Sequence, residues 1–273
     1  MLKGSTNPQL PKVLLTVNSS WSWRDPPQGR LDPTKVSEVV IGLKVSAVVP
    51  VYNEEEVIDE FSTRLVNSLQ NLCDYEVIFV VEGNDSTRDK LETLSKRDQR
   101  VKVDYQAKRL GLGRAMKRGM SLIDPNTDFV LTMDADLNHQ PEEIERLLLA
   151  AKEADVVVGS RTRTRGMVGE LPFFKRVVSA GTNWLLRNAF RISSSDVTSG
   201  FRVYSAKAVE RVRDELTSKN FEVAAELLIR AKKKGLTIAE VPITFIPRPR
   251  GTSKLSFLRS GVGYVKLLVK LGL

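Results

Sequence analysis

The sequence predicts an α/β protein built on a largely parallel sheet with helices on both of its faces. Apolar runs alternate with segments whose apolar residues recur at a helical period, which indicates repeated strand–helix units. The runs at residues 45–49, 129–133 and 155–161 are apolar along most of their length, as strands buried on both faces require. Parallel strands joined by helices are the expected connection for such units.

The individual elements follow one another with little interruption. A first strand is expected at residues 45–49, and Pro50 ends it. Three glutamates, Glu54 to Glu56, suit the positive end of the helix that follows, because the helix dipole favours acids there. Further strands are expected at residues 76–81, 101–105, 129–133 and 155–161, with helices between them, one of which covers residues 141–154.

The two ends of the chain differ from this central part. Residues 1–40 carry five prolines and little periodicity, so we expect an N-terminal extension there. Residues 257–273 place valines and leucines at helical spacing among basic residues, which predicts an amphipathic C-terminal helix. The sequence leaves open whether this helix packs on the domain or lies on an anionic membrane.

Composition and charge limit the possible functions. The 273 residues contain one cysteine and one histidine, which disfavours a disulfide, a structural zinc site and a Cys/His catalytic pair. The net charge of +9 is uneven, because residues 161–273 hold 22 Lys and Arg against eight Asp and Glu. Residues 1–160 are acidic, which suits a metal–nucleotide at one end and an anion at the other. We expect no nucleic-acid binding, because no recognised nucleic-acid-binding motif accompanies the basic half.

No stretch reaches the roughly eighteen consecutive apolar residues that a membrane-spanning helix needs. The sequence therefore predicts no transmembrane segment in this chain. Residues 171–190 interleave apolar and basic residues, as an amphipathic helix at a lipid surface does. We expect a peripheral protein on the cytoplasmic side of a membrane, and the lone Cys73 is consistent with a reducing compartment.

Two carboxylates end the run at residues 129–133. Asp134 and Asp136 are one residue apart, so on an extended backbone their side chains point to the same side. Ligands of open α/β sheets collect at the carboxyl ends of strands, and paired carboxylates suit a hard divalent cation. The sequence therefore predicts a metal site at this edge, although a short D-x-D pattern also occurs where acids only solvate a turn.

An ordered set of motifs extends over residues 45–256. In chain order these are PVYNEEE, KRLGLGRAMKRG, DADLN, GSR, DVTSGFRVY and RPRGTSKLS. Together they resemble the polyprenyl-phosphate glycosyltransferases of glycosyltransferase family two, most closely the dolichol-phosphate mannose synthases of that family. The resemblance implies a GT-A fold at residues 41–256, a nucleotide-sugar donor, a divalent metal (Mn²⁺ or Mg²⁺) and a polyprenyl or dolichyl phosphate acceptor.

The resemblance also implies roles for individual residues at the donor. Asp134, Asp136 and Asn138 are the expected metal ligands, with Asn138 at a position where relatives carry Gln. The turn after the second strand departs from the paired Asp of relatives, since Glu82 is followed by Gly83. This departure leaves open whether the donor is GDP-mannose or a UDP-sugar such as UDP-glucose. The residues expected to bind the nucleotide sugar are Pro50, Tyr52, Glu54, Glu82, Asp85, Asp134, Ala135, Asp136, Arg248 and Lys254.

The basic half is expected to bind the acceptor. By resemblance, Arg161, Arg176 and Ser179 bind the acceptor phosphate, and a guanidinium offers paired donors to phosphate oxygens. The expected reaction is an inverting sugar transfer in which Asp136 and Arg248 act in catalysis. Asp196 is also assigned to catalysis, to orient or deprotonate the acceptor, with Glu222 as a second candidate. A catalytically weak membrane- or anion-binding module on the same fold is the alternative.

Overall fold

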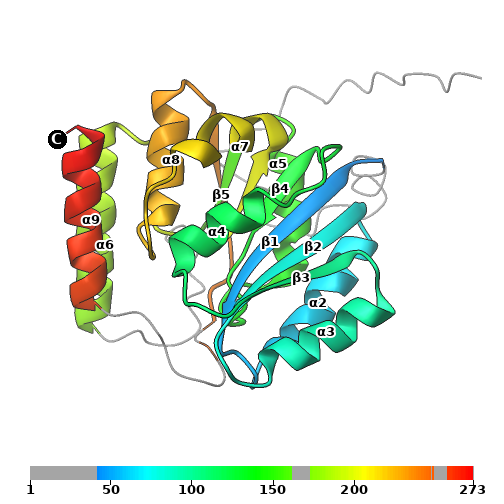
Figure 1. Cartoon of the computed structure of the whole chain (residues 1–273). Coiled ribbons are helices and arrows are strands. Elements are labelled where there is room, and N and C mark those ends of the chain that lie inside the picture. Colours follow the sequence, from blue (N-terminus) through cyan, green and yellow to red (C-terminus); the bar gives the residue numbers. More distant parts are fainter. Residues whose placement is uncertain (1–41, 162–172, 247, 249–256, 273) are drawn as a thin grey trace, which may run out of the picture.

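The structure, a computed structural model, describes residues 42–161, 173–246, 248 and 257–272 (Figure 1). Within these ranges the side chains of residues 173–178 and 257–260 are not described. The predicted N-terminal extension, residues 1–40, lies outside the described residues.

The core of the molecule is a seven-stranded sheet with the strand order β3-β2-β1-β4-β6-β5-β7. The strands β1, β2, β3 and β4 run parallel, and β7 runs parallel to β5. Only β6 is antiparallel to its neighbours, so the prediction of a largely parallel sheet is confirmed. The bounds are β1 Lys44–Tyr52, β2 Asp74–Glu82, β3 Val101–Gln106, β4 Phe129–Thr132, β5 Val156–Ser160, β6 Arg202–Ser205 and β7 Ile238–Pro242.

Helices cover both faces of this sheet, as its apolar strands require. On one face, α2, α3 and α5 contribute to a core with Phe61, Leu91 and Leu147. On the other face, α4, α7 and α8 pack around Met120, Val209 and Leu228 (Figure 1). The bounds are α2 Ile58–Gln70, α3 Thr87–Arg97, α4 Leu112–Met120, α5 Ile144–Ala150, α7 Ala206–Val212 and α8 Val223–Lys233.

Figure 1 draws the remaining two helices, α6 Phe173–Phe190 and α9 Phe257–Leu271, beyond α8, on the side of the molecule away from α2 and α3. Leu186 of α6 and Leu267 of α9 are buried in the second core, so both helices pack on the domain. Over the described residues, no helix has the length and apolar character that crossing a bilayer requires.

Two predicted boundaries differ from the structure. The helix expected at residues 141–154 is a short 3-10 turn, Pro141–Glu143, followed by α5 at Ile144–Ala150. The helix after β1 begins at Ile58, four residues beyond Glu54, because the backbone of Glu54 forms hydrogen bonds in the turn that precedes the helix. Its N–H donates to Thr87 Oγ1 at 3.0 Å, and its C=O accepts from the N–H of Val57 and Ile58. The turn is therefore fixed by contacts between elements that periodicity does not reveal.

Candidate active site

A cavity of about 570 Å³ opens at the carboxyl ends of β1, β2 and β4. Asp134, Asp136, Arg161 and Ser179 are among the residues that line it. Acids from the first half of the chain therefore line the same cavity as an arginine and a serine from the second half. This is the arrangement expected where ligands meet at the edge of an open α/β sheet.

The acid pair lies beyond the end of its strand. Because β4 ends at Thr132, both carboxylates project from an irregular segment, in which Leu137 has a positive φ of 61°. Asp136 accepts hydrogen bonds from Arg248 Nη2 and from Asn138 Nδ2, both at 2.8 Å. Enclosure by the cavity walls, and then the negative charge of Asp136, raise the pKa of Asp134 to about 7. The two acids thus share the cavity, and of the two only Asp136 accepts hydrogen bonds from the described residues.

Asn138 completes a set of oxygen donors at this point. Its side-chain Oδ1 is buried and has no hydrogen-bond partner within the part of the chain that the structure describes, while its Nδ2 bonds Asp136. A buried carbonyl oxygen without a partner is costly unless a ligand satisfies it. The described residues contain no group of three His, Cys, Asp or Glu side chains that alone fits a metal. The donor set therefore fits a cation that also takes oxygens from a ligand or water.

Arg248 connects the two acidic turns. Besides its bond to Asp136, its Nη1 lies 3.4 Å from a carboxylate oxygen of Glu54. The guanidinium is half-buried among acids, which raise its pKa against the effect of burial. The positively charged guanidinium of Arg248 therefore lies next to the acid pair even before any ligand binds. Lys254, predicted to act beside it, lies outside the described residues.

Another part of the cavity wall is formed by the carboxyl ends of β1 and β2 and by the segment after β3. Pro50, Tyr52 and Glu82 line it, and the guanidinium of Arg109 lies 4.0 Å from the centre of the Tyr52 ring. One oxygen of Glu82 accepts from the N–H groups of Leu110 at 2.9 Å and Gly111 at 3.2 Å. This part of the wall therefore offers an aromatic face, a cation and a fixed carboxylate.

Asp85, predicted for nucleotide binding, has a different placement. It is not among the residues that line the cavity. Its carboxylate accepts from the N–H of Glu55 at 3.2 Å and of Thr87 at 3.1 Å. Asp85 therefore joins the β1 turn to the first turn of α3, a local stabilising role.

The basic wall is organised around one buried ion pair. Arg161 donates to Asp196 through Nε and Nη2, both at 2.7 Å, and through Nη2 to Thr198 Oγ1 at 2.9 Å. Asp196 is fully buried, and although burial opposes ionisation, the charge and hydrogen bonds of Arg161 hold its pKa at about 2. Asp196 does not line the cavity, so its geometry suits a residue that positions Arg161.

Ser179 and Thr182 of α6 line the same cavity as Arg161. Arg176 is on α6, but its side chain lies outside the described residues. Glu222, the second candidate base, uses Oε1 to accept from the N–H groups of Lys219 and Asn220. Its other oxygen is buried against α9 and away from the cavity lining, so this placement suits a helix-start role.

The family model for glycosyl transferase family 2 matches residues 46–213. The chain belongs to glycosyltransferase family 2. Among its family 2 relatives, a dolichol-phosphate mannosyltransferase from Pyrococcus furiosus is 38% identical over 217 residues, which is 78% of this chain and 59% of that protein. An undecaprenyl-phosphate mannosyltransferase from Micrococcus luteus is 31% identical, over 78% of this chain and 88% of that protein. The chain therefore matches less than two thirds of the length of the first relative.

Solved structures confirm the GT-A fold of this family 2 chain. Glucosyl-3-phosphoglycerate synthase from Mycobacterium tuberculosis, in complex with Mn²⁺, UDP and phosphoglyceric acid, superposes with a TM-score of 0.68 at 19% identity. The match covers 90% of this chain and 85% of that structure. A UDP complex of the same enzyme gives a TM-score of 0.66, covering 90% and 84% of the two chains.

Several cavity residues were not predicted from the sequence. Arg109 lies in the quoted KRLGLG motif, and its guanidinium lies over the Tyr52 ring. Because arginine readily stacks on aromatic rings, its presence in this motif was the available signal. Thr182 and Tyr264 come from the two outer helices, whose position over the cavity no local pattern indicates. His139 is enclosed beside Asp134, and burial lowers its pKa to about 4, so its ring is neutral at neutral pH.

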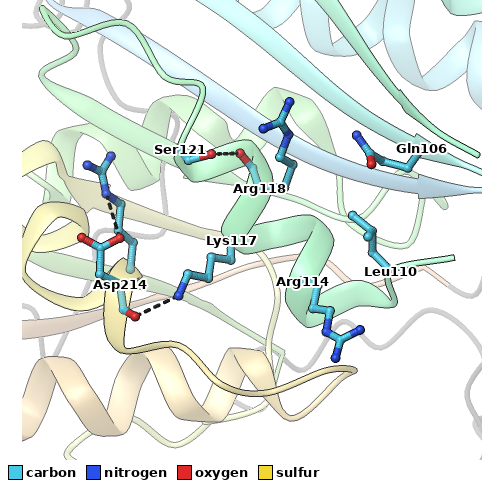
Figure 2. A pocket seen from close by; sticks show the side chains of 8 residues that line it. Gln106, Leu110, Arg114, Lys117, Arg118, Ser121 and Asp214 are labelled. Carbon is cyan, nitrogen blue, oxygen red and sulfur yellow. Dashed lines mark hydrogen bonds and ion pairs between the residues drawn. The ribbon is translucent and has the colours of Figure 1, made fainter. Parts of the chain in front are cut away.

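A second cavity, of about 550 Å³, lies beside α4 (Figure 2). Three of its lining cations are bonded to the protein itself. Lys117 Nζ donates to the Asp214 carbonyl at 2.8 Å, and Arg213 Nη1 donates to the Met120 carbonyl at 3.3 Å. Arg118 pairs with Asp104 at 3.0 Å. The acid pair, Arg161 and Ser179 all line the first cavity instead, so that cavity is the candidate active site.

Proposed function

We propose that this family 2 glycosyltransferase transfers mannose from GDP-mannose to dolichyl or another polyprenyl phosphate, with inversion and with a divalent metal. The observation that carries the proposal is the shared cavity, which Asp134, Asp136, Arg161 and Ser179 all line. The printed names of the Pyrococcus and Micrococcus relatives support a polyprenyl-phosphate acceptor and mannose as the sugar.

The oxygen donors of Asp134, Asp136 and Asn138 would hold the metal, Mn²⁺ or Mg²⁺. The unpartnered Asn138 Oδ1 supports this set, and the Mn²⁺ in similar structures supports a divalent cation. When bound, the cation supplies positive charge to a diphosphate. Mg²⁺ and Mn²⁺ both accept such oxygen ligands, so the metal has to be distinguished by assay.

The chain's own residues account for the rest of the chemistry. An acceptor phosphate is already an anion at neutral pH, so its oxygen attacks the anomeric carbon with little need for a base. The bond from that carbon to the diphosphate breaks, and its electron pair leaves with the diphosphate. Arg248, held 2.8 Å from Asp136, is placed to stabilise this developing charge. Arg161 and Ser179 would orient the phosphate on the opposite face of the sugar, which gives inversion.

The second candidate is transfer from a UDP-sugar to the same acceptor. Two observations favour it: similar solved structures contain UDP or UDP-glucose, and Glu82–Gly83 replaces the paired Asp of relatives. A panel of GDP- and UDP-sugars, each with Mn²⁺ or Mg²⁺ and a polyprenyl phosphate, tests both candidates. Lipid-linked mannose from GDP-mannose is the expected product. Transfer only from UDP-sugars would select the second candidate, and no turnover with any donor would indicate a catalytically weak binding module.

We also propose that α6 and α9 bind the membrane that holds the acceptor, as a peripheral contact on the cytoplasmic side. Their outer surfaces expose Trp184 (67%), Leu185 (44%), Val262 (55%), Val265 (60%) and Val269 (70%). Arg187, Lys266 and Lys270 are exposed on the same two helices, which suits anionic lipid.

A vesicle-sedimentation assay tests this membrane contact. Replacing Val265 and Val269 together by Asp should weaken binding to vesicles rich in anionic lipid by about tenfold or more, because burying each valine contributes about 1.5 kcal/mol. Replacing Thr93 and Gln99 together by Asp adds the same two charges at exposed positions on and just after the distant α3. This double variant is the matched control and should bind as wild type. Unchanged binding of the double variant would remove α9 from the contact.

A further inference from the structure

His139 occupies a closed socket directly behind the acid pair. Its side chain is 2% exposed, and its ring packs against Phe201 and Phe245 with centroid distances of 5.5 and 5.7 Å. A backbone bridge to Phe245 fixes the main chain at the same point. The ring also forms part of the cavity wall. His139 is therefore held rigidly between apolar rings with one side toward the reaction site.

The polar atoms of this ring are not used by the fold. Within the described residues, neither Nδ1 nor Nε2 has a hydrogen-bond partner. Burying a ring donor and a ring acceptor without partners costs stability, and native proteins rarely accept that cost without a ligand or a functional reason. An apolar side chain of similar size would fill this aromatic socket without the cost. Packing alone therefore does not account for a histidine here.

The nearest charged group indicates what the ring is placed for. Nδ1 lies 4.0 Å from Oδ2 of Asp134, beyond hydrogen-bond length but within reach of a small rotation of the carboxylate. Gly200 lies on the Oδ2 side of the same carboxylate, where an added Cβ would approach Oδ2 to 3.0 Å. Asp134 therefore has room to turn, and within the described residues it accepts no hydrogen bond, whereas Asp136 accepts from Arg248 and Asn138.

We propose that His139 is a positioning residue that donates an Nδ1–H hydrogen bond to Asp134 when a cation and a nucleoside diphosphate occupy the cavity. The bond fixes the rotamer of a carboxylate that has no other partner among the described residues, as outer hydrogen bonds do at metal sites. This inference rests on the proposed function for the metal and the diphosphate. It adds that Asp134, unlike Asp136, depends on a single buried neutral ring for its orientation.

Two substitutions separate positioning from packing. His139→Leu keeps the socket apolar and removes the donor, whereas His139→Asn places an amide nitrogen near the position of Nδ1. We expect His139→Leu to raise the dissociation constant for Mn²⁺ by about 10- to 100-fold in the presence of GDP or UDP. Its melting temperature without ligand should equal or exceed that of wild type, because unsatisfied buried polar atoms are removed. His139→Asn should recover Mn²⁺ binding to within about threefold of wild type.

The measurement is titration calorimetry of the full chain with Mn²⁺ and each nucleoside diphosphate, paired with thermal unfolding of the ligand-free protein. Wild-type Mn²⁺ affinity in His139→Leu would overturn the proposal. Equal losses of affinity and melting temperature in both variants would also overturn it, because they indicate a packing role. If the wild-type protein does not bind Mn²⁺ in the presence of GDP or in the presence of UDP, the proposed function itself fails, and this inference fails with it.

Discussion

At the residue scale, the two carboxylates of the D-x-D segment have different surroundings although only one residue separates them. Asp136 is neutralised by Arg248 at 2.8 Å and bonded by Asn138. Asp134 faces the cavity without such a partner among the described residues, and its pKa is raised to about 7. Asp136 is therefore the acid that the ligand-free protein already pairs with Arg248, the cation that we assign to the diphosphate.

Substitution of Asp136 tests this assignment. Asp136→Ala removes a proposed metal ligand and the partner of Arg248, so we expect transfer to fall by about 10²- to 10³-fold or more. The fold should persist, because Asp136 lies on the wall of a cavity and not in the apolar core. Initial rates with saturating donor and acceptor, together with circular dichroism, measure both effects.

Asp85→Ala is the matched control, since Asp85 is an acid near the same sheet edge that does not line the cavity. It should keep kcat within about threefold of wild type. Its free energy of unfolding should fall by at most about 1–2 kcal/mol, because the hydrogen bonds of Asp85 to the turn and to the start of α3 are lost. Full transfer activity in Asp136→Ala would remove the metal hypothesis.

The buried Asp196–Arg161 pair predicts a pH-dependent stability. The pKa of Asp196 is lowered to about 2 from an ordinary value near 4, so its contribution is complete above about pH 4 and is lost as pH falls toward 2. Asp196→Asn leaves Arg161 buried without its charge partner and should cost about 3 kcal/mol at pH 7. Urea unfolding from pH 7 to pH 2 should show this gap shrinking only below about pH 4. A gap independent of pH would mean that the charge of Asp196 contributes nothing.

At the element scale, α9 answers a question that the sequence left open. Leu267 (3% exposed) and Leu271 (7%) pack it into the second core, while Val262, Val265 and Val269 face outward. The helix therefore packs on the domain and still presents an apolar surface, and its contact with lipid stays a prediction. Tyr264 and Gly261 of the same helix line the cavity, so α9 also forms part of the cavity wall.

Two helical glycines provide a test of this packing. An added Cβ at Gly263 of α9 would lie 2.7 Å from Oε2 of the buried Glu222, whereas at Gly181 of α6 it would meet nothing within 4 Å. Gly181→Ala should therefore stabilise by about 1 kcal/mol through helix propensity. Gly263→Ala should instead destabilise by about 1–3 kcal/mol through overpacking. Denaturant unfolding of both variants gives the sign, and a gain in Gly263→Ala would show that α9 does not pack closely on α8.

At the scale of the whole molecule, the charge asymmetry of the chain becomes an asymmetry across one cavity. The acidic first half supplies Glu54, Asp134 and Asp136, and the basic second half supplies Arg161 and Arg248. Arg248 crosses to the acidic wall and bonds two of its members. The two halves therefore divide the cavity into a proposed donor end and a proposed acceptor end with Arg248 between them.

Steady-state kinetics with both substrates varied test this division. Ser179→Ala removes a hydroxyl from the acceptor wall and should raise the KM for polyprenyl phosphate several-fold, about 1 kcal/mol, with the donor KM unchanged. Arg176→Ala should act in the same direction by our resemblance-based assignment. Arg248→Ala is the contrasting variant and should lower kcat and weaken the donor. Equal effects of Ser179→Ala on both substrates would contradict the division.

Much of the sheet was predictable because burial on both faces leaves a near-continuous apolar run. Residues 45–49 and 129–133 correspond in this way to β1 and β4. The strands β6 and β7 were not predicted, because they are short and mix polar with apolar residues; Arg202, for example, is fully buried within β6. Its guanidinium donates hydrogen bonds to the carbonyls of Val197 and Ala224. The burial of this charged side chain therefore depends on residues outside β6.

The sequence by itself determined the α/β class, the family and the acids at the end of β4, because periodicity and local motifs depend only on neighbouring residues. Only the tertiary structure decided which of these groups share a cavity. It brought Arg248 to Asp136 and buried Asp196 against Arg161. It also left Asp85 outside the cavity lining and made α9 part of the cavity wall. Arg248 and Asp136 are 112 positions apart in the sequence, and Arg161 and Asp196 are 35 apart. Such contacts depend on how the helices and strands pack, and the whole core determines that packing.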